Sequence, residues 1–305
     1  MSQCDRQTAI ARAAATYPYF YKLQFDVLTG IRQYAEQRVG VQREFFLTEM
    51  IGNFDESELT TLARPNFNSY TGYNESIYRY IPGQGLQNQF LVSTSPANAL
   101  SPGNIGDRQQ FEFPPFNVKA NDFIYGRVDF SGSGIAPAAD ATIYTGYKGY
   151  SVLDEPYITT DRQTDQIKNS LSAPIDWQWF NFEVADPGAN SQRTIHIVEN
   201  DMYPRLIVGM ARLDHGFGLP LFNFVDIYDV SRRLRLTDTH IPLEFLAPSM
   251  VYPLRDSEYY QTPCYYFPVE YYFEPYAKIQ IDVIAERTNP AIASTTTVSF
   301  LTRTI

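Results

Sequence analysis

The sequence predicts an all-β protein with two tandem antiparallel β-sandwich domains and a short N-terminal helical arm. Its length of 305 residues is about twice that of a common domain, which favours two domains. Aromatic residues reach 15%, and such side chains favour the half-buried surfaces of pleated sheets. The second half of the chain also repeats the strand pattern of the first half.

Composition supports a folded β class. Hydrophobic residues make up 44% of the chain and charged residues only 19%, which is enough apolar material for two cores and too little charge for a disordered chain. The 20 prolines and 17 glycines are scattered along the chain. This distribution favours many short strands joined by turns rather than long helices.

The elements follow in order from the N-terminus. Residues 5–15 (DRQTAIARAAA) are the one stretch with good helical propensity, and Asp5 can cap the first turn. This helix is short, so we expect an arm that docks on another surface, such as a neighbouring subunit. Residues 17–28 alternate aromatic and polar residues as a strand does. The predicted boundaries are an arm at 1–16, a first sandwich at 17–152, a polar linker at 153–171 and a second sandwich at 172–305.

Four blocks recur in the same order in both halves. They pair residues 24–30 with 181–188, 46–55 with 205–214, 114–130 with 268–283, and 141–149 with 295–303. A period of about 155 residues is far longer than a solenoid repeat, so we infer a domain duplication. Each half has about eight strand-like runs without helical connectors, which is typical of two packed antiparallel sheets, and a jelly-roll-like sandwich fits that number.

Charge argues against a nucleic-acid partner. The net charge is −10, with 34 acidic against 24 basic residues, whereas a duplex-binding surface must neutralise phosphates with Lys and Arg. The one dense basic cluster is Arg232, Arg233 and Arg235, which we expect at solvent-facing strand positions. The start of the chain lacks the apolar core of a signal peptide, and no run approaches the ~20 apolar residues of a membrane helix. We therefore expect a soluble protein made in a cytosol, which stays there or leaves inside a larger particle.

Residues that usually carry catalysis form no motif. We expect His196, in RTIHIVE, to be an exposed strand residue opposite a buried face. Asp214 and His215 precede a Gly-rich loop, where we expect a turn capped by the aspartate, and His240 lies in the turn-like segment TDTHIP. The two cysteines, Cys4 and Cys264, lie far apart in the sequence and make no zinc-site pattern. We predict no catalytic, cofactor-binding or metal-binding residues, no cofactor and no enzyme.

The tyrosine-rich segments are more specific. Tyrosine joins apolar area to a polar tip, which favours it at interfaces, although packing within the sheets is the alternative interpretation. The candidate interface residues are Tyr70, Tyr73, Tyr78, Tyr80, Tyr259, Tyr260, Tyr265 and Tyr266. A platform on which aromatic faces stack against sugar rings is a further alternative.

A family resemblance rests on the succession of strand segments in the second half, NFEV, RTIHIVEN, LIVGMARLD, KIQIDVIAE and TTTVSFLTRTI. This succession resembles the β-sandwich domains of bacteriophage virion structural proteins, including capsid decoration and minor head proteins. It covers most of residues 172–305 and, more weakly, 17–150. A duplicated sandwich also resembles the double jelly-roll major capsid proteins of tailless viruses, in which two rolls stand side by side and three copies form a pseudo-hexagonal trimer.

The resemblance implies a non-enzymatic virion protein that assembles on or within a capsid or head. Its expected partners are further copies of itself, with a trimer as one candidate, and other virion proteins. Its expected location is the virion, after synthesis in the host cytoplasm. The alternatives are a major capsid protein of the double jelly-roll type, a carbohydrate-binding or adhesin module of a tail or fibre that binds a glycan, and an enzyme acting on glycosides through paired carboxylates.

Overall fold

The computed structural model describes fifteen stretches of the chain. They are residues 11–27, 34–51, 68–73, 80–81, 85–86, 91–96, 110–121, 123–129, 141–154, 176–185, 192–215, 222–246, 249–250, 265–286 and 295–305. The chain divides into two compact units. Residues 21–149 form one unit, here called the first sandwich, and residues 1–20 with 150–305 form the other, the second sandwich. The predicted boundaries of arm, linker and domains stay predictions, and most of the linker lies outside the described residues.

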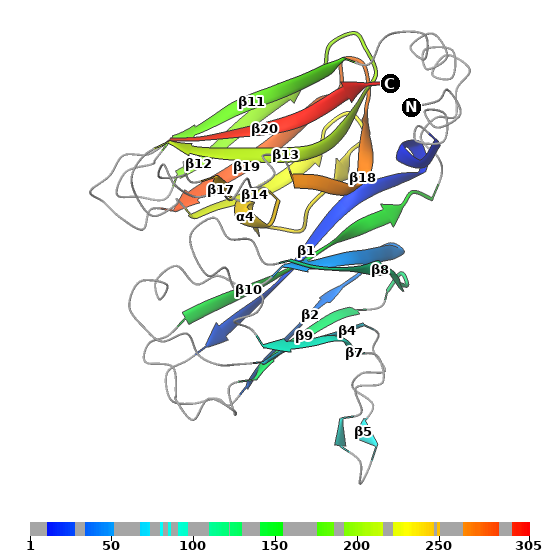
Figure 1. Cartoon of the computed structure of the whole chain (residues 1–305), viewed down its shortest axis with the longest axis vertical. Helices are drawn as coiled ribbons and strands as arrows, with labels where there is room; N and C mark the ends of the chain where they lie inside the picture. The colour runs from blue at the N-terminus through cyan, green and yellow to red at the C-terminus, as the bar shows by residue number, and fades with distance from the viewer. Residues whose placement is uncertain are drawn as a thin grey trace, which may run out of the picture. The chain divides into compact units, whose positions relative to one another are not determined.

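The second sandwich has two sheets (Figure 1). One contains β11 (Trp177–Ala185), β20 (Thr295–Thr304), β13 (Arg205–His215), β18 (Tyr265–Phe273) and β17 (Ser249–Met250). The other contains β12 (Gln192–Glu199), β19 (Lys278–Glu286), β14 (Phe222–Asp229), β15 (Leu234–Arg235) and β16 (Ile241–Pro242), which leads into the one-turn helix α4 (Leu243–Leu246). The orders are β11–β20–β13–β18 and β12–β19–β14–β15, with β17 also beside β13 and β16 also beside β14. All pairings are antiparallel except that of β17 with β13.

The first sandwich has the same arrangement. Its sheets contain β1 (Thr16–Val27), β10 (Ala141–Val152), β3 (Phe45–Ile51) and β8 (Gln110–Val118), and β2 (Tyr34–Gly40), β9 (Phe123–Asp129), β4 (Asn68–Tyr73) and β7 (Leu91–Pro96). Their orders are β1–β10–β3–β8 and β2–β9–β4–β7. Two short strands, β5 (Tyr80–Ile81) and β6 (Gly85–Leu86), pair separately. The division between the two units falls within β1 and β10.

Both units are therefore jelly rolls. In one sheet of each unit, the last strand lies between the first strand and the third. In the other sheet, the second strand lies beside the last strand but one. This alternation of successive strands between two sheets is the jelly-roll order. The four repeated sequence blocks overlap strands in equivalent positions, namely β1 with β11, β3 with β13, β8 and β9 with β18 and β19, and β10 with β20. The predicted fold class is confirmed, and the shared order supports the duplication.

The central strands of the second sandwich are buried on both faces. Toward the second sheet, Phe182 of β11 and Phe300 of β20 lie in the interior, where Phe182 also contacts His196 of β12 at a centroid distance of 5.0 Å. On the outer face, Leu206, Val208, Tyr272, Leu301 and Ile305 form a cluster that also contains Ala13. A strand that is covered on both faces needs apolar residues at successive positions, which explains the run LIVGM in β13.

The described end of the N-terminal helix, residues 11–15, supplies part of that cover (Figure 1). Ala13 and Ala14 are buried, and the Leu153 amide donates to the carbonyl of Ala15 at 2.9 Å. Further along, Phe20 makes an isolated bridge to Thr237 and packs edge-on against Phe267. The predicted helix is confirmed over these residues. It docks on its own chain, so its removal would expose Leu206, Val208 and Leu301.

In the first sandwich a glycine and an ion pair mark the contact between β3 and β10. A Cβ atom added at Gly149 would lie 2.1 Å from the carbonyl oxygen of Phe46 and 2.6 Å from the Phe45 ring, so only glycine fits there. The neighbouring Lys148 is buried, and its Nζ lies 3.5 Å from Oε1 of Glu49, which is also buried. The Thr48 hydroxyl donates to the Lys148 carbonyl at 3.3 Å. These contacts fix the approach of the two strands.

Candidate interaction surfaces

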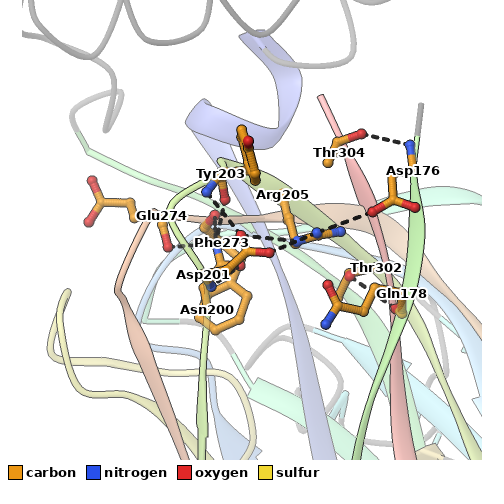
Figure 2. A network of polar contacts seen from close by, with 10 residues as sticks. All are labelled: Asp176, Gln178, Asn200, Asp201, Tyr203, Arg205, Phe273, Glu274, Thr302 and Thr304. Atoms are coloured by element: carbon orange, nitrogen blue, oxygen red, sulfur yellow. Dashed lines mark hydrogen bonds and ion pairs between the residues drawn. The ribbon is translucent and has the colours of Figure 1, made fainter. Parts of the chain in front are cut away.

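One end of the second sandwich is closed by a polar network (Figure 2). Asn200, which follows β12, is buried, and its amide nitrogen lies 2.9, 3.0 and 2.7 Å from the carbonyl oxygens of Tyr203, Phe273 and Glu274. Its own carbonyl oxygen accepts a bond from the Asp201 amide at 2.9 Å. A single side chain thus ties the β12–β13 turn to the end of β18, and its polar atoms are satisfied within the fold.

An ion pair extends this network toward β11 and β20. Arg205 donates to Oδ2 of Asp201 at 2.9 Å and reaches Oδ2 of Asp176 at 3.4 Å, while the Asp176 amide donates to the Thr304 hydroxyl at 2.8 Å. Burial works to raise the pKa of Asp201. Hydrogen bonds from Arg205 and the Tyr203 amide outweigh it, so this pKa lies below its usual range. Both aspartates share Arg205 as a basic partner, so the network serves to hold the strand ends together.

The histidines do not form a reactive site among the described residues. His196 points inward and is only partly exposed, so the prediction of an exposed residue is wrong. Its ring contacts Phe182 and lies 3.2 Å from the Thr194 hydroxyl, and burial lowers its pKa. Asp214 and His215 are wrongly predicted as a turn, because both continue β13 and pair with Thr296 and Thr295. His240 lies in a turn, as predicted, with a positive φ of 52°.

The arginine cluster follows its prediction in part. Arg235 lies exposed on β15, as predicted, whereas Arg232 and Arg233 lie in the turn after β14. The guanidinium carbon of Arg232 lies 5.1 Å from the Tyr271 ring centroid and 5.3 Å from that of Tyr272. The cation therefore packs on aromatic faces, an arrangement that stabilises it electrostatically. The cluster is thus part of the structure of this turn.

Large apolar side chains are exposed on β11 and β12, each of which lies at one edge of a sheet of the second sandwich. In the described part of the chain, β11 pairs only with β20, and β12 pairs only with β19. Both tryptophans of the chain lie on the outer face of β11, where Trp177 is 54% and Trp179 42% exposed. On β12, Ile195 is 58% and Ile197 60% exposed. Exposed apolar groups on a strand with a free edge are typical of a binding surface.

The outer face of the β12 sheet carries arginine–aspartate pairs on either side of two adjacent aspartates. Arg193 of β12 pairs with Asp282 of β19, and Arg235 of β15 lies 3.6 Å from Asp226 of β14. Asp226 and Asp282 are direct neighbours across β14 and β19. At the other end of β12, Glu199 lies 3.1 Å from the ammonium group of Lys278. Of these charges the sequence indicated only Arg235, and it did not indicate the exposed isoleucines, since side-chain period alone does not say which face of a strand is covered.

The predicted tyrosine interface stays a prediction. Tyr265 and Tyr266 begin β18, where Tyr265 is buried and Tyr266 exposed, because alternate residues of a strand face opposite sides. Tyr70 and Tyr73 lie on β4, and Tyr80 lies on β5. The remaining predicted residues, Tyr78, Tyr259 and Tyr260, lie outside the described residues. Tyr265 and Tyr266 therefore lie on opposite faces of the sheet and do not share one surface.

No group of three or more His, Cys, Asp or Glu side chains is placed to hold a metal ion in the part of the chain that the structure describes. Within the same residues, no helix has the length and apolar character needed to cross a membrane.

Comparisons with known proteins give weak structural similarities. No family model and no curated protein matches the chain. A structure described as the triple jelly roll fold and turret assembly of an archaeal virus matches with 9% identity and a TM-score of 0.25, over 92% of this chain and 58% of that one. The VP2 subviral particle of infectious bursal disease virus matches with 9% identity and a TM-score of 0.22, over 95% and 72%. This chain thus spans less than two thirds of the archaeal virus protein, and its fold assignment rests on the strand order described above.

Proposed function

We propose that this chain is a non-enzymatic virion structural protein that assembles through protein–protein interfaces, in the manner of the double jelly-roll capsid proteins that its sequence resembles. The observation that carries the proposal is the shared strand order of two jelly rolls within one chain. Jelly rolls build viral shells and also bind saccharides, so the fold alone leaves both classes open. The exposed surface of the second sandwich supplies the observations that favour one of them.

The surface of the second sandwich favours assembly. The strands β11 and β12, each at one edge of its sheet, expose four large apolar side chains, Trp177, Trp179, Ile195 and Ile197. Burying a side chain of this size stabilises a complex by about 1.5–3 kcal/mol before the costs of association. The net charge of −10 suits a surface directed away from a genome. The partners are then further copies of this chain and other virion proteins, and the location is the capsid.

Carbohydrate binding is the second candidate, and Trp177 with Trp179 favours it. The two side chains stand on one face of β11 two residues apart, which is a spacing of about 7 Å, and aromatic faces of this kind can stack on sugar rings. Because these are the two tryptophans of the whole chain, intrinsic fluorescence reports directly on this site.

The solution mass of the purified full chain tests the proposal. Light scattering over a concentration series should show a trimer or a larger assembly, and electron microscopy should show ordered particles or sheets. A monomer at every concentration, with tryptophan fluorescence that shifts and saturates on addition of a saccharide, would overturn the assembly proposal in favour of carbohydrate binding.

A further inference from the structure

We propose that the edge of β12 that no described strand pairs with is a self-association surface, on which two copies of the chain pair their β12 strands antiparallel about a two-fold axis beside His196. This inference deepens the proposed function and rests on it, because it names one of the interfaces through which the protein would assemble. Three independent features of β12 support it: exposed isoleucines, self-complementary charge along the strand, and charges on the neighbouring strand that continue the same alternation.

The first feature is the orientation of the strand. The alternation in RTIHIVE predicts buried isoleucines and an exposed histidine, but the structure has the reverse arrangement. Ile195 and Ile197 are 58% and 60% exposed, while His196 faces the interior beside Phe182. Natural edge strands protect themselves with Lys, Pro, bulges or short length. The eight residues of β12 contain no Pro or Lys and pair with β19 in unbroken register, and the charges of Arg193 and Glu199 lie only toward its ends, so among the described residues the isoleucines between them are open to a partner.

The second feature is the order of residues along β12. In an antiparallel pair centred on His196, Arg193 lies opposite Glu199 of the other copy, and Ile195 lies opposite Ile197. Two-fold symmetry makes each of these contacts twice. Opposite charges and β-branched residues that face each other across strands stabilise a sheet, whereas like charges destabilise it. A parallel pairing would instead place Arg193 beside Arg193, so the sequence selects the antiparallel arrangement.

The third feature is the charge on the strand behind β12. Arg193 already contacts Asp282, and Glu199 lies 3.1 Å from Lys278. The arginine is 63% exposed and the glutamate 53%, so each can also accept a second partner. In the paired sheets the row would run Ile284 and Arg193 of one copy, then Glu199 and Lys278 of the other. Its three charges alternate in sign, and Asp282, which lies opposite Ile195, contacts Arg193 from the diagonal position, which favours this register over its neighbours.

The strand β11, at the edge of the other sheet, lacks this complementarity. The outward residues of β11 are Trp177, Trp179, Asn181 and Glu183, with an acidic group at one end and no basic group at the other. Pairing two β11 strands in the equivalent way would place each Glu183 opposite a tryptophan. Between the edges at β11 and β12, the structure therefore assigns the second copy to β12.

Disulfide trapping tests the register. In full-length protein with Cys4→Ser and Cys264→Ser, the variants Ile195→Cys and Ile197→Cys are each oxidised alone and as a mixture. A disulfide requires Cβ atoms about 3.8 Å apart, which holds for directly opposite residues and not for diagonal neighbours at about 7–8 Å. We expect a crosslinked dimer in the mixture, with at least about tenfold less in either variant alone. Equal crosslinking in all three samples, or none in the mixture, would overturn the proposal.

A charge swap tests the energetics by sedimentation across concentration. Arg193→Glu and Glu199→Arg should each weaken the β12-dependent association step by at least about tenfold, since like charges then face each other twice. The double swap should restore the association to within about threefold of wild type. The double swap restores opposite charges only between copies. Within each copy the introduced glutamate would lie near Asp282 and the introduced arginine near Lys278, so like charges would remain there. A double swap that associates as weakly as the single variants would contradict the inference.

Two controls complete the design. Val230→Lys adds a charge at an exposed apolar residue after β14, off the β12 edge, and should leave association unchanged. Thermal melting of every variant shows that the fold is retained. If all β12 variants assembled normally, the β12 interface would be ruled out and the proposed function would stand. If the wild-type protein were monomeric and gave no crosslinks, both the β12 interface and the proposed function would be ruled out.

Discussion

The two jelly rolls share a strand order but stabilise their central strands by different means. In the second sandwich the N-terminal helix covers the outer face of β13 and β20, and the contacts are apolar. In the first sandwich, β3 and β10 are held by the close approach at Gly149 and by the buried pair of Lys148 and Glu49. Duplication thus preserves the topology, while the residues that stabilise it diverge. Apolar cover tolerates small changes, whereas a close approach and a buried ion pair do not.

The largest expected effect is at Gly149. Gly149→Ala places a methyl group 2.1 Å from a backbone oxygen, which cannot move as a flexible side chain can. Overpacking a core usually lowers the free energy of unfolding by about 1–3 kcal/mol, and for Gly149→Ala we expect a loss of about 4 kcal/mol or more. Urea denaturation of the full chain, monitored by circular dichroism, measures the loss.

Gly40→Ala is the matched control in the same sandwich. The added Cβ atom would lie 3.6 Å from the Phe123 ring, which is ordinary contact. We expect the free energy of unfolding to change by less than about 1 kcal/mol, in either direction. If the two alanine variants were equally stable, the close approach of β10 to β3 would not be a determinant of the fold.

The next effect is at the buried ion pair. Glu49→Gln leaves the Lys148 ammonium group without its carboxylate, and breaking such a pair costs about 3–5 kcal/mol. We expect about 3 kcal/mol, and a double variant with Glu49→Leu and Lys148→Met should regain most of it, since apolar residues of similar volume can replace a buried pair. A double-mutant cycle on unfolding free energies measures the coupling.

The second sandwich supplies the comparison for this cycle. Arg303 donates to both carboxylate oxygens of Glu270, at 3.0 and 2.6 Å, but Glu270 is partly exposed. Water can replace part of the lost contact, so Glu270→Gln should cost roughly half as much as Glu49→Gln. Equal losses would mean that burial does not distinguish the two sandwiches.

The sequence predicted the architecture because repetition and period are properties of local sequence. The four repeated blocks mark strands in equivalent positions, and their order survives in both units. The face of a strand and the length of a strand depend on distant residues. His196 turns inward because Phe182 of β11 contacts it, and β13 continues through Asp214 and His215 because Thr295 and Thr296 of β20 pair with them. Local turn propensity is weaker than a formed ladder of backbone hydrogen bonds.

The polar network around Asn200 and Arg205 likewise depends on residues that are distant in the sequence. Asn200 and Asp201 lie in the segment ENDMYPR, whose composition indicates only a turn. The carbonyl groups of Phe273 and Glu274 that Asn200 binds lie more than seventy residues away. Sequence spacing carries no sign of such contacts. The exposed Trp177 and Trp179 were missed for a related reason, since the alternation in WQWFNFEV does not say which face a neighbouring sheet covers.

The smallest expected effect is on the pH dependence of stability, and it lies in the second sandwich. The pKa of Asp201 is lower in the folded chain than its usual value, so the folded state binds this proton less readily than the unfolded state. The stabilisation by Asp201 is therefore fully present above the unfolded pKa of about 3.9 and is lost as the pH falls through the folded value. Because the side chain is 39% exposed, solvent screens it, and we expect less than about 1 kcal/mol. Urea midpoints of wild type and Asp201→Asn should differ at pH 7 and converge toward pH 3. A difference that persists unchanged at pH 3 would show that the Asp201 carboxylate contributes through its shape and its bond from the Tyr203 amide rather than through its charge.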